Sequence, residues 1–266
     1  MRLDVQNLKK TYSDGTQALN GLSFNVEQGE GVVILGHNGC GKSTLMKCLT
    51  GIEDITEGSI ILNGTDLTTA PKRELRELRQ KIGCVFQKFN MVGNLSVLQN
   101  VLFGLMGRKG YFACNSITAN KSDRLLAMDS LERVGLSHLA GRRTDTLSGG
   151  QQQRVAIARM LMQDAEIVFA DEPVASLDPK AGHEVMTLLW DIIKERKMTV
   201  ICVLHQIEFA REFGDRFVGL NSGKLMFDSL SSNISQQDID QLYKINTNVL
   251  ENSNGTSFNE TQFSAA

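Results

Sequence analysis

Several features that mark whole classes of protein are missing from this sequence. Its longest apolar stretches, 32–35 and 200–204, fall far short of the roughly 18 residues that a membrane-spanning helix needs. The N-terminal residues contain no apolar segment of the kind that secretion signals carry. The five cysteines include no CxxC pair, which argues against a zinc site or a disulfide framework and favours a reduced, cytosolic compartment.

A strong positive charge is also absent. The formal net charge is −2, so no basic field indicates a nucleic-acid partner. The chain has 266 residues, of which 41% are hydrophobic. This length and composition predict one large domain, or a core with a subdomain.

Short apolar runs alternate with helical patterns along the chain. Strands are expected at 3–8, 22–26, 31–35, 59–62, 167–170 and 199–204. Helices are expected at 44–50 and 183–197. The stretch 72–165 is mostly helical in pattern, with a loop at 107–122. The alternation predicts an α/β fold with a mostly parallel sheet, into which the helical stretch is inserted as a subdomain.

The composition changes after about residue 228. The last residues are polar, poor in apolar side chains and without a period. We therefore expect 229–266 to be a weakly ordered tail without chemistry of its own.

One segment has the spacing of a phosphate-binding loop. Residues 36–43, GHNGCGKS, fit the pattern GxxxxGK[ST] between an expected strand and an expected helix. The glycines allow backbone N–H groups to face phosphates, Lys42 supplies a positive charge, and Ser43 offers a hydroxyl to Mg²⁺. The expected ATP-binding residues here are Gly36, His37, Asn38, Gly39, Cys40, Gly41, Lys42, Ser43 and Thr44.

Two acids follow the apolar run 167–170. Asp171 and Glu172 would lie at the rim of the sheet, where Asp171 could hold Mg²⁺ through water. Glu172 could orient or deprotonate an attacking water. By itself this pattern is more often a solvated strand end, and only the phosphate loop upstream favours a catalytic interpretation.

A second glycine turn, Leu147-Ser148-Gly149-Gly150-Gln151, stands about a hundred residues after the first. With the phosphate loop before it, it resembles the signature motif of the ATP-binding-cassette (ABC) family. The resemblance covers about residues 2–228. It implies a P-loop NTPase fold with an N-terminal antiparallel β subdomain, a mostly parallel core and a helical subdomain at about 88–157.

The resemblance also implies roles for residues outside the phosphate loop. Tyr12 would stack on adenine, and Gln87 would touch Mg²⁺ and the attacking water. His205 would contact the γ-phosphate. The signature motif would bind ATP held by a second copy of the chain, and the loop Ser176-Leu177-Asp178 would couple the two sites.

In the family, such chains are peripheral subunits on the cytoplasmic face of the inner membrane. The resemblance therefore implies ATP and Mg²⁺ as cofactors and three partners: a second copy, integral membrane permease subunits and, through them, an external substrate-binding protein. Segments 86–92, 95–107, 171–179, 204–206 and 217–228 resemble the ATP-binding subunit of phosphonate importers. Residues 107–122 match no such pattern.

Other functions stay open at this point. The cargo could be phosphite, or an unrelated compound such as an amino acid or a lipoprotein. A cassette acting on DNA or ribosomes is disfavoured, because the chain has one cassette, no heptad array and no basic patch. A small-molecule P-loop kinase would leave residues 147–151 unexplained.

The phosphate loop departs from the common family form at His37 and Cys40. A cysteine beside phosphates and a helix N-terminus could have a lowered thiol pKa, which would make Cys40 reactive. The alternative is a small residue that only fills space.

Overall fold

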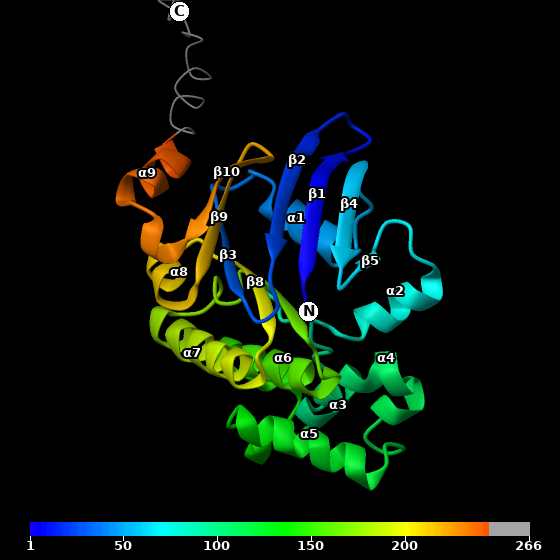
Figure 1. Cartoon of the computed structure of the whole chain (residues 1–266). Helices are drawn as coiled ribbons and strands as arrows, with labels where there is room; N and C mark the ends of the chain where they lie inside the picture. Colours follow the sequence, from blue (N-terminus) through cyan, green and yellow to red (C-terminus); the bar gives the residue numbers. More distant parts are fainter. Residues whose placement is uncertain (245–266) are drawn as a thin grey trace, which may run out of the picture.

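The computed structural model describes residues 1–244 and contains two sheets (Figure 1). The smaller sheet is antiparallel and has the strand order β2-β1-β4-β5. Its strands are Leu3–Thr11 (β1), Gln17–Val26 (β2), Glu57–Leu62 (β4) and Thr65–Asp66 (β5). The expected turn at Asn63-Gly64 joins β4 to β5, since both residues adopt the positive φ that a tight hairpin requires.

The larger sheet has the strand order β10-β9-β3-β8-β7-β6. Its strands are Gly31–Leu35 (β3), Ile82–Phe86 (β6), Ile167–Asp171 (β7), Thr199–Val203 (β8), Arg216–Asn221 (β9) and Lys224–Leu230 (β10). Every pairing is parallel except that of β9 with β10. The expected α/β fold with a mostly parallel sheet and an N-terminal antiparallel sheet is confirmed.

Helices surround the larger sheet and form a separate group at the lower end of Figure 1. The α-helices are Lys42–Leu49 (α1), Lys72–Arg79 (α2), Val97–Leu102 (α3), Met106–Lys109 (α4), Lys121–Arg133 (α5), Gly149–Gln163 (α6), Pro179–Arg196 (α7), Ile207–Phe213 (α8) and Gln236–Lys244 (α9). Short 3-10 turns include Phe103–Leu105 (η1) and Tyr111–Cys114 (η2). Within residues 1–244, no helix combines the length and the apolar character that crossing a bilayer requires.

Strand β3 separates two hydrophobic clusters. Val33 and Leu35 belong to a cluster shared with α6, α7 and the lower helices, whereas Val32 and Ile34 belong to a cluster shared with the small sheet and α1. Successive side chains of a strand point to opposite faces, so a strand covered on both sides is apolar throughout. This arrangement explains the run GVVIL and fixes the position of the loop that follows it.

The structure corrects the expected helical stretch at 72–165. Residues 82–86 form β6, the edge strand of the parallel sheet, rather than helix. The expected loop at 107–122 contains the end of α4, the turn η2 and the start of α5. Helix α7 begins at Pro179, four residues earlier than expected, because Asp178 caps it and proline is favoured in the first turn.

The expectation of a weakly ordered tail from 229 is wrong for the residues that the structure describes. Residues 229–230 complete β10, and α9 follows. Ile239 and Leu242 of α9 are 1% and 0% exposed and belong to the same cluster as Val33. The folded domain therefore extends to at least residue 244, and 245–266 lie outside the described residues.

Candidate functional site

The loop after β3 has a backbone path that only glycine follows without strain. Gly36, Gly39 and Gly41 have φ angles of 153°, 79° and 109°. A Cβ on Gly36 would lie 2.3 Å from the carbonyl oxygen of Leu220, and one on Gly41 would lie 2.6 Å from that of Ala18. The sequence pattern of spaced glycines thus corresponds to a tightly wound loop leading into α1.

Lys42 occupies the inside of this loop. Its ammonium group donates to the carbonyl oxygens of Gly36 and His37, at 2.7 and 2.9 Å, and the residue is 4% exposed. Gly41 has no side chain to cap α1, so the first amides of the helix are open to an anion. Phosphate oxygens are stronger acceptors for an ammonium group than carbonyls are. The loop is therefore suited to a polyphosphate.

A pocket of about 490 Å³ lies beside the loop. It brings together eight of the residues expected to bind or hydrolyse ATP, namely Tyr12, Asn38, Gly39, Gly41, Lys42, Ser43, Thr44 and Glu172. The hydroxyl group of Tyr12 lies 3.3 Å from that of Thr44, and the ammonium of Lys10 lies 5.0 Å from the centre of the Tyr12 ring. Thus one aromatic side chain, held in place, stands at the mouth of a phosphate-binding pocket.

Five further residues of this pocket were missed from the sequence. They come from the end of the β1–β2 turn, the start of β2 and the β9–β10 turn, and are Thr16, Gln17, Ala18, Ser222 and Gly223. Gly223 approaches the phosphate loop closely, since its N–H donates to the carbonyl of Cys40 at 2.9 Å. The Ser222-Gly223 pair is a recognisable turn, with both φ angles positive. Its sequence alone does not place it beside residue 40.

Two titratable side chains meet at the carboxyl end of β7 and β8. Nε2 of His205 lies 2.5 Å from Oε1 of Glu172. Glu172 also has a positive φ of 49°, and its N–H donates to Val203 at 3.2 Å. The pair is a carboxylate held by an imidazole at the edge of the phosphate pocket.

Asp171 supplies a buried acceptor that no group of the described residues satisfies. Its Oδ1 is buried and has no hydrogen-bond partner among the described residues. Burial, and then the neighbouring Glu172 carboxylate, raises the pKa of Asp171, while Lys42 acts in the opposite sense. A cation beside Asp171 would bind this oxygen. Its positive charge would also favour the ionised carboxylate and so oppose the rise in pKa.

These groups fit Mg²⁺ better than a transition metal. Mg²⁺ keeps several waters and binds through one or two oxygen ligands of the protein, as Asp171 and the Ser43 hydroxyl can provide. Across residues 1–244, no group of three or more His, Cys, Asp or Glu side chains is arranged to hold a metal ion. The donor set is thus consistent with a cation that binds together with phosphates.

The signature segment lies in a different pocket. Ser148 caps α6, and Ser148 and Gln151 each donate a backbone N–H to the other's side chain, at 3.0 and 3.3 Å. Ser148, Gly150 and Gln151 line a hollow of about 300 Å³ that shares no lining residue with the phosphate pocket. One chain therefore does not bring residues 147–151 to its own phosphate loop.

Gln87 and the loop 176–178 line neither of these two pockets. A Cβ on Gly149 would lie 2.9 Å from Cδ2 of Leu177, so the signature segment packs on the loop 176–178. The hydroxyl of Ser176 donates to the carbonyl of Gln87 at 3.4 Å. Gln87 itself is exposed and does not line the phosphate pocket.

The two unusual residues of the phosphate loop do not line its pocket. Nε2 of His37 lies 3.1 Å from Oδ1 of Asn221, and Nδ1 lies 2.7 Å from the carbonyl of Asn38. Cys40 is 1% exposed, and burial raises the pKa of its thiol despite the nearby Lys42. The expectation of a lowered thiol pKa is wrong, and Cys40 fills space against Gly36.

Comparisons with known proteins point to one family. The family model described as ABC transporter matches residues 19–175. A phosphonates import ATP-binding protein PhnC from Frankia casuarinae is 49% identical over 230 residues, which cover 86% of this chain and 91% of that protein. The PhnC protein of Lactobacillus johnsonii is 43% identical over 244 residues, covering 91% of this chain and 95% of that one.

Solved structures match over most of the fold. The ATP-binding cassette MJ0796, in a dimeric post-hydrolysis state with ADP and Pi, is 34% identical with a TM-score of 0.75 and covers 87% of this chain and 100% of its own. The cbiO1 protein from Clostridium perfringens, part of the ABC transporter complex cbiONQ, is 32% identical with a TM-score of 0.77. It covers 94% of this chain and 96% of its own.

Proposed function

The chain belongs to the ABC transporter family and is one of its ATPase cassettes, and on that premise we propose that it powers the import of phosphonates. Two copies act together on integral membrane permease subunits at the cytoplasmic face of the membrane. An external binding protein delivers the cargo to the permease. The observation that carries the cargo is the match of nearly the whole chain to proteins named for phosphonate import, at 43–49% identity.

The geometry supports a division of labour within the phosphate pocket. Lys42 and the amides of the glycine loop bind the phosphates, and Tyr12 stacks on the base. Mg²⁺, held by Ser43 and Asp171, supplies neutralising charge to the phosphate oxygens when bound. Glu172 orients the attacking water and accepts its proton, and His205 fixes the direction of that carboxylate.

Separation of the two pockets supports a paired mode of action. The signature residues cannot complete the phosphate site of their own chain, because they line a hollow elsewhere. A second copy can present its Ser148 and Gly150 to that site. Closure of the pair over ATP, and reopening after hydrolysis, would then move the permease.

Uptake measurements test this proposal. Transporter-deficient cells carrying the chain with its membrane and binding partners receive labelled methylphosphonate, phosphite or phosphate. We expect uptake of methylphosphonate, and at least a ~100-fold slower ATP hydrolysis with loss of uptake for Glu172→Gln, since the amide cannot accept a proton. The variant keeps the shape of the side chain, so ATP binding measured by filter retention serves as its control.

Other outcomes would change the assignment in distinct ways. Uptake of phosphite alone would keep the mechanism and replace the cargo. No uptake of any of the three compounds by an assembled complex would contradict the import of phosphorus oxyanions. Unchanged hydrolysis in Glu172→Gln would remove Glu172 from the mechanism.

A further inference from the structure

A strained turn follows Gln87 almost directly. Phe89 and Asn90 both have positive φ angles, of 52° and 50°. Asparagine tolerates this conformation, but a bulky aromatic residue adopts it only at a cost in free energy. The N–H of Phe89 donates to the carbonyl of Phe86, the last residue of β6, at 3.1 Å. We call residues 89–90 the strained turn, and its conformation requires a group that maintains it.

Arg159 of α6 is that group. Its guanidinium donates to the carbonyl oxygens of Asn90 and Phe89, at 2.7 and 3.2 Å. Two donors of one planar fork therefore hold two successive carbonyls of the strained turn. Among the described residues, no carboxylate acts on this guanidinium, and burial lowers its pKa. Burying a cation without an acid is costly, so the two carbonyl contacts are what keep the side chain in this place.

The strained turn also touches the signature segment. A Cβ on Gly149 would lie 3.6 Å from Cζ of Phe89 and 2.9 Å from Cδ2 of Leu177. The ring is thus within van der Waals range of the start of α6, where the leucine leaves room only for a glycine. Phe89 is half-buried and belongs to neither hydrophobic cluster. Its contact with Gly149 is therefore separate from the packing of the core.

Helix α6 holds the strained turn at two points. The carbonyls of the turn bind Arg159, and the ring of Phe89 meets Gly149, about three helical turns away on the same helix. Two separated contacts fix both the position and the direction of the turn relative to the signature segment. Neither Phe89 nor Arg159 lines the phosphate pocket or the hollow of the signature residues.

We propose that Arg159 is a positioning residue for the signature segment. By holding the strained turn, it keeps the ring of Phe89 against Gly149 and so sets the placement of Ser148 and Gly150. This inference rests on the proposed function, because it concerns how each chain completes the nucleotide site of the other. Arg159 acts through the turn and makes no contact with ATP.

ATP-dependent dimerisation tests the proposal. The parent is the full chain with Glu172→Gln, which we expect to bind ATP with very slow turnover. Its dimer Kd is measured by analytical ultracentrifugation with ATP and Mg²⁺. Adding Arg159→Met, which cannot hold the carbonyls, should raise this Kd about tenfold. Binding of a fluorescent ATP analogue to the single chain, at low protein concentration, should be unchanged, because Arg159 does not line the phosphate pocket.

Two glycine variants of the same parent separate the ring from the backbone. Phe89→Gly adopts a positive φ without strain but lacks the ring, so we expect it to weaken dimerisation as Arg159→Met does. Asn90→Gly relieves strain and keeps both the ring and the carbonyls, so it should dimerise like the parent. Urea unfolding followed by the fluorescence of Trp190, the one tryptophan, checks that each variant is folded. If Arg159→Met does not fold, Phe89→Gly decides the outcome.

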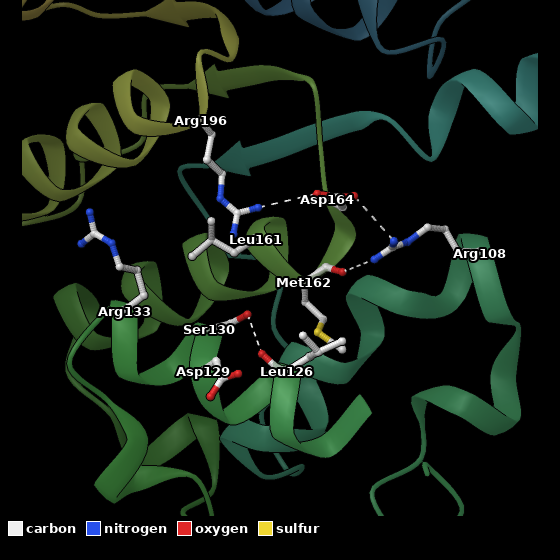
Figure 2. Close-up of a pocket in the computed structure, with 9 residues that line it drawn as sticks. All are labelled: Arg108, Leu126, Asp129, Ser130, Arg133, Leu161, Met162, Asp164 and Arg196. Atoms are coloured by element: carbon white, nitrogen blue, oxygen red, sulfur yellow. Dashed lines mark hydrogen bonds and ion pairs between the residues drawn. The ribbon is translucent and has the colours of Figure 1, made fainter. Parts of the chain in front are cut away.

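The matched control is Arg108→Met in the same parent. Arg108 also donates to a backbone carbonyl of α6, that of Met162, at 2.6 Å (Figure 2). It lines a hollow of about 470 Å³ that shares no residue with the phosphate pocket or with the hollow of the signature residues. We therefore expect the dimer Kd of this control to match that of the parent.

Parent-like dimerisation of both Arg159→Met and Phe89→Gly would overturn this proposal and leave the proposed function standing. Equal weakening by Arg108→Met would mean a general loosening of α6 and would also overturn it. Weakening by Arg159→Met with normal dimerisation of Phe89→Gly would overturn the route through the ring. A parent that does not dimerise with ATP would overturn the paired action on which both proposals rest.

Discussion

Glu172 and His205 form a pair of titratable side chains, and Glu172 lines the phosphate pocket. Glu172 has a positive φ, which for a residue with a side chain costs free energy of order 1–3 kcal/mol. The surroundings maintain it through the N–H contact to Val203 and the imidazole of His205. Such a strained carboxylate beside a phosphate loop indicates a selected position rather than an ordinary strand end.

Removing the imidazole should affect turnover more than ATP binding. In His205→Ala we expect kcat for ATP hydrolysis to fall about 100-fold, with KM changed little, because Glu172 loses the group that directs it. Steady-state kinetics on the purified chain would measure both. His183→Ala is a matched control, because His183 also pairs with a glutamate, Glu212, at 3.0 Å but outside the pocket. An equal fall of kcat in both variants would contradict the role of His205 in directing Glu172.

Cys40 should be unreactive in the folded chain. Burial raises its thiol pKa, so at pH 8 the nucleophilic thiolate is scarcer than in the unfolded chain, and the side chain is also covered. Iodoacetamide at pH 8 should leave Cys40 unmodified in peptide mass maps and leave ATP hydrolysis intact. Labelling after unfolding in urea is the control. Modification of Cys40 in the folded chain, with ATP protecting, would restore the hypothesis of a reactive thiol.

At the scale of single residues, the sequence predicts those whose side chains carry chemistry and misses those that contribute only backbone to the pocket. Lys42, Glu172 and Tyr12 were expected and lie in one pocket. Ala18 and Gly223 line the same pocket, but their contribution is backbone, placed by the start of β2 and by the β9–β10 turn. No side-chain chemistry marks such residues, and only the fold brings them together.

Helix α9 closes the fold at the end of the described chain. Its apolar residues Ile239, Leu242 and Tyr243 have the spacing of one helical face. The side chains of Ile239 and Leu242 are buried among those of the central cluster. The helix is thus part of the domain rather than an appendage.

Truncating this face should destabilise the chain. For Leu242→Ala we expect the free energy of unfolding to fall by about 2–5 kcal/mol, because a fully buried leucine leaves a cavity. Urea unfolding followed by Trp190 fluorescence would report it, since Trp190 is the one tryptophan and lies in the same cluster. Leu230→Ala, at a 54% exposed position, should change the free energy of unfolding by less than about 0.5 kcal/mol. If both variants lowered the free energy of unfolding by similar amounts, α9 would lie outside the core.

Two elements show why sequence patterns give incomplete boundaries. Strand β6 is a five-residue apolar run directly after the charged helix α2, and a run that short has no period to separate strand from helix. Helix α9 is mostly polar, so its composition indicated a tail even though its three apolar residues had helical spacing. Both were decided by packing against residues distant in sequence.

At the scale of the whole molecule, the proposed function makes the phosphate pocket and the signature hollow two incomplete halves of a nucleotide site. The phosphate pocket lies between the two sheets' turns and α1, while the signature hollow lies between α6 and α7. The order of motifs along the chain predicted both halves and the fold that holds them. The family resemblance also implied that the halves act in different copies, whereas the order of motifs alone does not, because separation is a property of the assembled layers rather than of any segment.

The segment 111–118 also bears on how such a chain can diverge. Gln99 and Thr118 hold the backbone, whereas Tyr111, Phe112 and Ile117 project outward and belong to neither hydrophobic cluster. We therefore expect substitutions at these three positions to leave the ATPase and its core intact. A gene duplicate could therefore acquire a new outer face without refolding.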